Sequence, residues 1–131
     1  MVAVGVNPDK SATYPRELRL QWLAEIAWPW PNVEVSSCGH EFLVRYAERI
    51  GAGFVLRGIR NESDYAYGRA MRSVNADLTD RVTTVFLMPP REMAEVSSSL
   101  VRGMIGPAGW RDVVQAYVPA CVFAHLDREH V

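Results

Sequence analysis

The sequence lacks a long hydrophobic run, a leader pattern and an excess of charge of either sign. No apolar stretch reaches the roughly 20 residues of a membrane-spanning helix, so we expect no membrane partner. Met1 runs directly into VAVGV, without the basic segment and cleavage pattern of a signal peptide, so the cytoplasm is the expected location. The formal net charge is −1, which gives none of the basic field that nucleic-acid binding requires.

Cysteine and histidine are few and scattered. Cys38 and Cys121 allow one disulfide, but two reduced thiols are the expected state in a cytosolic protein. His40, His125 and His130 have no further ligands at metal-binding spacing around them. The sequence therefore predicts no metal ligated by the protein.

The composition is that of one globular domain covering residues 1–131. Of these residues, 49% are hydrophobic and 22% are charged, which is enough for a core without disulfides or structural metal. Apolar, β-branched runs alternate with segments of helical spacing. The predicted strands are 2–6, 33–37, 53–56 and 82–88; the predicted helices are 15–28, 41–51, 62–78, 97–106, 110–117 and 120–128. This alternation predicts an α/β fold with a parallel sheet and helices on both faces.

Phosphate-binding residue types follow three of the predicted strands. Lys10 follows the first strand, Arg57, Gly58 and Arg60 follow the third, and Ser97–Ser99 open the helix after the fourth. In a parallel sheet these positions share one edge, where open α/β folds bind ligands. Each also has a plainer interpretation, as a solvated lysine, a surface turn and a helix cap. Together they favour a site for a polyphosphate.

Two blocks carry a family resemblance. VLRGIRNESDYAYGRAMRSVN and VFLMPPREMAEVSSSLVRGM, taken together, resemble phosphopantetheine adenylyltransferase, and the resemblance extends over the whole chain. It implies a Rossmann-like, doubly wound parallel sheet in a cytidylyltransferase-like single domain. It also implies a nucleotidyltransferase of coenzyme A biosynthesis, which uses ATP and 4′-phosphopantetheine, with Mg²⁺, to make dephospho-coenzyme A and pyrophosphate. The implied assembly is a homo-oligomer, a hexamer in this family.

The resemblance also implies site residues. Lys10 and Arg60 take the catalytic positions, and Lys10, Leu43 and Arg57 take those that bind phosphopantetheine. The implied ATP-binding residues come from two segments and one helix position: Gly58, Ile59, Arg60, Gly68, Met93, Ala94, Glu95, Val96, Ser97, Ser98 and Ser99.

The sequence departs from this family in three places. Nothing matches the family's opening strand, Gly-rich loop and Thr-x-Gly-His motif, so we expect a missing strand–loop–helix unit of roughly thirty residues, with its strand between those at 2–6 and 53–56. Gly68 replaces a glutamate near the ATP ribose, and Met93 replaces an aromatic residue near the adenine. The alternative to an active enzyme is a degenerate paralogue that binds nucleotide, a coenzyme A-like ligand or only protein partners, without catalysis.

Overall fold

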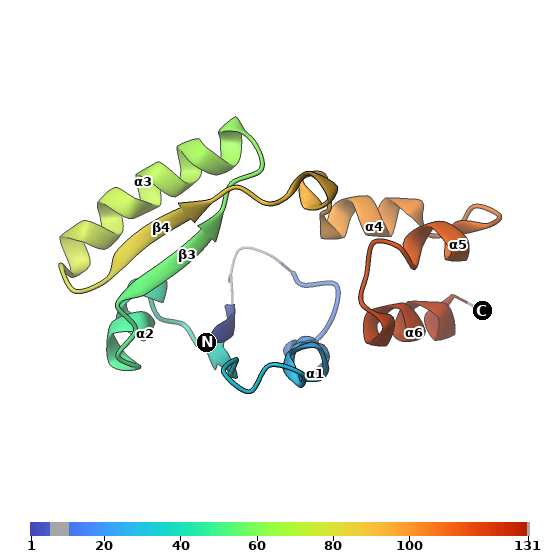
Figure 1. Cartoon of the computed structure of the whole chain (residues 1–131), viewed down its shortest axis with the longest axis horizontal. Helices are drawn as coiled ribbons and strands as arrows, with labels where there is room; N and C mark the ends of the chain where they lie inside the picture. Colours follow the sequence, from blue (N-terminus) through green and yellow to red (C-terminus); the bar gives the residue numbers. More distant parts are fainter. Residues whose placement is uncertain (6–10, 131) are drawn as a thin grey trace. The chain divides into compact units, whose positions relative to one another are not determined.

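The computed structural model describes residues 1–5 and 11–130 (Figure 1). In chain order its elements are β1 (Val2–Gly5), α1 (Arg16–Ala27), β2 (Val35–Cys38), α2 (Leu43–Arg49), β3 (Phe54–Gly58), α3 (Glu62–Leu78), β4 (Thr83–Leu87), the 3₁₀ turn η1 (Arg91–Met93), α4 (Ser98–Met104), α5 (Trp110–Val114) and α6 (Ala120–Glu129).

The described strands form two parallel pairs. β1 pairs with β2, with Val2 opposite Val35, and β3 pairs with β4, with Phe54 opposite Thr83. Each pair is joined through a helix, as a parallel connection requires. The predicted α/β class with parallel strands is confirmed, although among the described residues the strands lie in two small sheets.

The chain divides into two compact units. Unit 1 consists of Met1–Gly39 and Val96–Val131, and unit 2 consists of His40–Glu95. Unit 1 therefore contains β1, β2, α1 and the helices α4 to α6, whereas unit 2 contains β3, β4, α2 and α3.

Unit 1 has a core built mainly from helices. Val101, Trp110, Val114 and Leu126 form one buried cluster, which joins α4, α5 and α6. The Trp22 ring packs edge-on against Tyr14 and His125, with ring centroids 5.2 Å from each, and so joins α1 to α6. These aromatic contacts add to the burial of apolar area.

Unit 2 is a thin two-layer arrangement. In Figure 1, α3 runs alongside β3 and β4. Val55 and Phe86 lie on the half-buried sheet face toward α3, whereas Phe54 and Leu56 on the other face are 71% and 66% exposed. The small buried cluster of this unit is Val44, Ala47 and Val82.

The predicted bounds of α3 match the structure, whereas those of β3 do not. The predicted bounds of α3, 62–78, are those observed, and the Asn61 side chain caps its first turn by accepting a hydrogen bond from the Asp64 N–H. The predicted end of the third strand, Leu56, is wrong, because β3 continues through Arg57 and Gly58. These two residues pair with Phe86 and Leu87 of β4, a contact distant in sequence.

No helix among the described residues is long and apolar enough to cross a membrane.

Candidate functional site

Arg57 lies within β3 and its side chain is directed toward α3. Side chains alternate between the two faces of a strand, so Arg57 shares its face with Val55, and Gly58 shares the exposed face with Leu56. The continuation of β3 by two residues therefore places an arginine under a helix, where the sequence alone had placed it in a loop.

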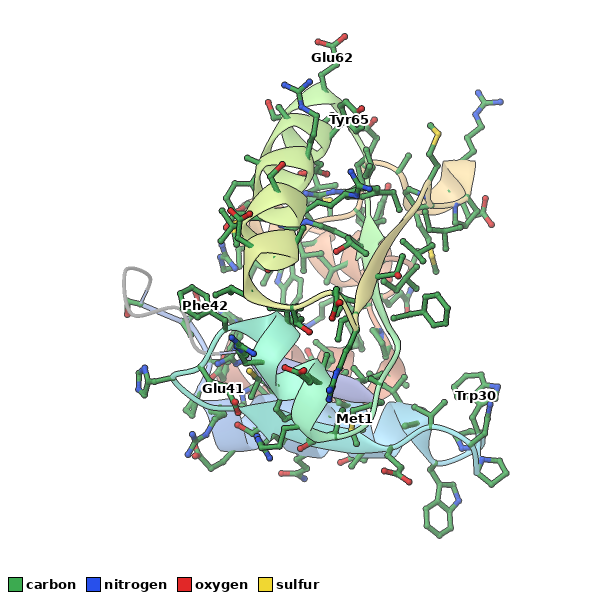
Figure 2. All side chains as sticks on the ribbon, turned by 90° about the vertical axis from the view of Figure 1, so that its left-hand side faces the viewer. Met1, Trp30, Glu41, Phe42, Glu62 and Tyr65 are labelled. Carbon is green, nitrogen blue, oxygen red and sulfur yellow. The ribbon has the colours of Figure 1, made fainter. Side chains whose placement is uncertain are left out.

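A small cavity of about 50 Å³ lies beside Arg57, and we call it the α3 cavity. This volume is roughly that of two water molecules, so it suits a compact group more than a whole extended substrate. Its lining combines apolar side chains with several hydrogen-bond donors: Phe42, Leu43, Val55, Arg57, Gly68, Met71, Arg72, Asn75 and Thr84. In Figure 2 the labelled Phe42 lies beside α2, below the end of α3 opposite Glu62 and Tyr65.

Leu43 and Arg57, which the sequence predicted as substrate-binding residues, meet in this cavity. Leu43 is the first residue of α2 and follows the N-cap residue Phe42, whose backbone is extended. Its exposed side chain reaches the cavity from α2, and Arg57 reaches it from β3. An apolar side chain beside a guanidinium suits a ligand that has a phosphate and an apolar chain.

Three donors in the lining were missed by sequence reasoning. Arg72 and Asn75 come from α3, and Thr84 comes from β4. The signal for two of them was present, because Gly68, Arg72 and Asn75 follow one another at helical spacings of four and three residues. Thr84 had no such signal, since its place depends on the pairing of β4 with β3.

The guanidinium of Arg57 packs against an aromatic ring. Its central carbon lies 4.8 Å from the centroid of the Tyr67 ring, in a cation–π contact. This contact orients the arginine and leaves its N–H groups available to an acceptor.

Arg60 forms an ion pair with Asp64 in the first turn of α3. The Arg60 Nε and backbone N–H donate to Asp64 Oδ2 over 3.0 Å and 3.1 Å. These hydrogen bonds lower the pKa of Asp64 below its ordinary value, and the hydrogen bond from the Arg60 side chain contributes most. The same pair raises the pKa of Arg60. A ligand phosphate would therefore compete with Asp64 for Arg60.

The other predicted nucleotide residues of unit 2 lie at the exit of β3, within α3 and around the turn η1 that follows β4. Ile59 donates its backbone N–H to the Leu87 carbonyl over 2.9 Å, which fixes the exit of β3. Met93 ends the turn η1 with an exposed side chain, and Ala94 and Glu95 follow it.

The remaining predicted nucleotide residues, Val96–Ser99, belong to unit 1. Ser97 caps α4, because its Oγ accepts a hydrogen bond from the Leu100 N–H over 3.2 Å. Ser99 Oγ accepts from the Arg102 guanidinium over 3.2 Å. The capping interpretation therefore holds for Ser97, whereas Ser98 has neither of these two roles.

Val96, Ser97 and Ser98 also line a larger hollow in unit 1. Its volume is about 650 Å³, and its walls come from β1, α1, α4 and α6 together with the segment around Tyr117. Most of the lining is apolar, with Arg19 and Arg102 as its two charged residues.

Lys10, the predicted bridging lysine, lies outside the described residues. The described residues contain no group of three or more His, Cys, Asp or Glu side chains that could hold a metal ion.

Comparisons with known proteins give several relatives that share one name. Phosphopantetheine adenylyltransferase of Neisseria meningitidis serogroup C is 48% identical over 130 residues, which are 99% of this chain and 76% of that protein. The protein of the same name from Chromobacterium violaceum is 48% identical over 126 residues, 96% of this chain and 77% of its own length. That from Leuconostoc citreum is 38% identical over 122 residues, or 93% and 75% of the two chains. No family model matches the chain.

Proposed function

Because the chain belongs to the phosphopantetheine adenylyltransferase family, we propose that it transfers the adenylyl group of ATP to 4′-phosphopantetheine. The products of this reaction are dephospho-coenzyme A and pyrophosphate. We place the protein in the cytoplasm. The structural observation that best supports this proposal is the meeting of Leu43 and Arg57 in the α3 cavity.

In the proposed reaction, a phosphate oxygen of phosphopantetheine attacks the α-phosphorus of ATP. A new P–O bond forms, the bond from the α-phosphorus to the bridging oxygen of the β-phosphate breaks, and pyrophosphate leaves with that electron pair. Such a transfer depends on alignment and charge neutralisation more than on a protein nucleophile. Arg57 and Arg60 meet this requirement, because each guanidinium can neutralise and orient a phosphate group.

Arg57 is the residue that we assign to the phosphate of phosphopantetheine, and Leu43 is its apolar neighbour. A guanidinium can donate two parallel hydrogen bonds to one phosphate, which fixes the position of the attacking oxygen. Arg72 and Asn75, on the same face of α3, add two more donors to the α3 cavity.

We assign ATP contacts to each unit separately. In unit 2, Arg60 neutralises phosphate charge after exchanging Asp64 for the nucleotide, beside Gly58 and Ile59. The assignments of Met93–Glu95 in unit 2, Val96–Ser99 in unit 1, and Lys10 as the bridging cation rest on the family resemblance. Magnesium enters with ATP as the substrate complex, since triphosphate oxygens and water are its usual ligands.

The first test is pyrophosphate release by the 131-residue chain with ATP, magnesium and 4′-phosphopantetheine. Arg57→Ala should raise the KM for phosphopantetheine by about 10- to 100-fold, the loss expected for charge-assisted hydrogen bonds of about 1.5–3 kcal/mol. Arg69→Ala is the matched control, because Arg69 is an exposed arginine of α3 that does not line the α3 cavity.

The result decides between the enzyme and its alternative. Turnover that is sensitive to Arg57 and indifferent to Arg69 supports the adenylyltransferase. Binding of both substrates without turnover identifies a binding paralogue, and equal kinetics in both arginine variants contradict the assignment of Arg57. We also propose that the chain forms a homo-oligomer, which the family resemblance implies to be a hexamer. Light scattering of the purified chain measures the mass of the assembly.

A further inference from the structure

Gly68 lies inside α3 at a place where glycine is intrinsically unfavourable. Glycine in a helix interior costs about 1 kcal/mol relative to alanine, so its presence calls for a reason. Gly68 is the one buried residue of α3. A Cβ added there would lie 2.9 Å from Cε1 of Phe86 and 3.3 Å from both Cδ and Nε of Arg57. Gly68 therefore provides the space in which these two side chains lie against the helix.

Gly103 offers an internal comparison. It too lies inside a helix, α4, but a Cβ added there meets nothing within 4 Å. The close approach is therefore a property of Gly68 and does not apply to helical glycines of this chain in general.

Arg57 is held from more than one side. Its Cδ and Nε pass beside Gly68, and its guanidinium lies over the Tyr67 ring. Phe86 is the cross-strand neighbour of Arg57 in the β3–β4 register. The Phe86 ring also packs edge-on against Tyr65, with centroids 6.4 Å apart, which limits how far it can move. An alanine at position 68 would force the Phe86 ring to shift and would also press on Cδ and Nε of Arg57, so we expect the Arg57 side chain to change its orientation.

We propose that Gly68 and Tyr67 are positioning residues that hold Arg57 in the orientation in which its guanidinium binds the phosphate of the substrate. The proposal rests on the proposed function, since the phosphate is that of phosphopantetheine. A side chain already fixed in its binding conformation loses less entropy when the ligand arrives, so its hydrogen bonds contribute more to affinity.

The position of Arg57 can be followed without any substrate. In a ¹H–¹⁵N spectrum of the free chain, the Nε–Hε signal of Arg57 is assigned by its disappearance in Arg57→Lys. We expect Gly68→Ala and Tyr67→Leu to move this signal, the second through loss of the ring current. Tyr67→Phe, which keeps the ring, and Gly103→Ala should leave it in place.

Calorimetric titration then connects position with affinity. Gly68→Ala should weaken 4′-phosphopantetheine binding about tenfold, as expected if one charge-assisted hydrogen bond is lost. Tyr67→Leu should weaken it about threefold, the loss expected for an exposed cation–π contact, and Tyr67→Phe should restore it. ATP affinity should stay unchanged in the two Tyr67 variants.

Three results would overturn the proposal: an Arg57 signal that does not move in Gly68→Ala, unchanged phosphopantetheine affinity in that variant, or a loss confined to ATP. The last would return Gly68 to the nucleotide role that the family resemblance implies. Because the Tyr67 side chain is exposed, Tyr67→Leu stays informative even if Gly68→Ala does not fold. If the parent chain binds no phosphopantetheine while the signals move as expected, the proposed function fails and the positioning of Arg57 stands.

Discussion

The two units of this chain bury different kinds of side chain. Unit 1 gathers Trp110, Val114 and Leu126 into an apolar cluster. Unit 2 has a smaller cluster around Val44 and uses the sheet face under α3 to hold Arg57. The difference teaches that the unit with the smaller buried cluster is the one that packs an arginine between a strand and a helix.

The largest stability effect should come from the cores, compared through one substitution. Val114 in unit 1 and Val44 in unit 2 are 0% and 1% exposed, so Val→Ala removes the same buried groups from each. We expect Val114→Ala to lower the free energy of unfolding by about 2–3 kcal/mol, and Val44→Ala by about 1–2 kcal/mol. The smaller cost follows because the thin layers of unit 2 can close more of the space left behind.

Urea unfolding of both variants, with Val113→Ala as the control, measures this difference. Val113 is the half-exposed neighbour of Val114 in α5, so its truncation should cost within about 0.5 kcal/mol. A larger loss for Val44→Ala than for Val114→Ala would reverse the comparison.

The helix caps give a smaller and more even effect. Asn61 caps α3 in unit 2 and Ser97 caps α4 in unit 1, each through one side-chain acceptor. Either change to alanine should cost about 1 kcal/mol, measured by thermal unfolding.

Substitutions in Ser97–Ser99 can distinguish helix capping from ligand binding. Ser98→Ala should leave the unfolding temperature unchanged and weaken ATP binding if the segment contacts the nucleotide. Full ATP affinity in Ser98→Ala, together with a destabilised Ser97→Ala, would reduce the serines to a structural role.

The smallest effect concerns pH and the pair formed by Arg60 and Asp64. Because the folded-state pKa of Asp64 is lowered, its stabilising contribution is present above the unfolded pKa near 4 and is lost as the pH falls through the folded pKa. Asp64→Asn should remove this part of the acid dependence, whereas Asp77→Asn, at an exposed position in the same helix, should not. Identical acid unfolding curves for the parent and Asp64→Asn would contradict a native role for the pair. Because the Asp64 side chain is only partly buried and solvent screens the pair, we expect a small effect.

Local patterns predicted much of the fold. The Asn61 cap, the acidic first turn and the apolar spacing of residues 62–78 are contained in one segment, and the bounds of α3 were predicted from it. The end of β3 was not predicted correctly. Arg57 and Gly58 resemble loop residues and become part of the strand only because they pair with Phe86 and Leu87.

The candidate site divides in the same way. Leu43 and Arg57 were predicted through the family resemblance, and the fold brings them to one cavity. Thr84 and the close approach of Gly68 to Phe86 depend on the packing of β4 against α3, which no local pattern contains. In the sequence, Gly68 was noted as a departure from the glutamate that this family usually has. In the structure it coincides with a close contact, because a Cβ at position 68 would lie 2.9 Å from Cε1 of Phe86.

The measurement that tests the central claim most directly is a calorimetric titration of the parent chain and Arg57→Ala with 4′-phosphopantetheine and with pantetheine, which lacks the phosphate. If Arg57 binds that phosphate in the α3 cavity, the parent prefers phosphopantetheine by about 10- to 100-fold, and Arg57→Ala loses most of this preference while its affinity for pantetheine stays the same. An equal preference for the phosphorylated ligand in the parent and in Arg57→Ala would contradict the account.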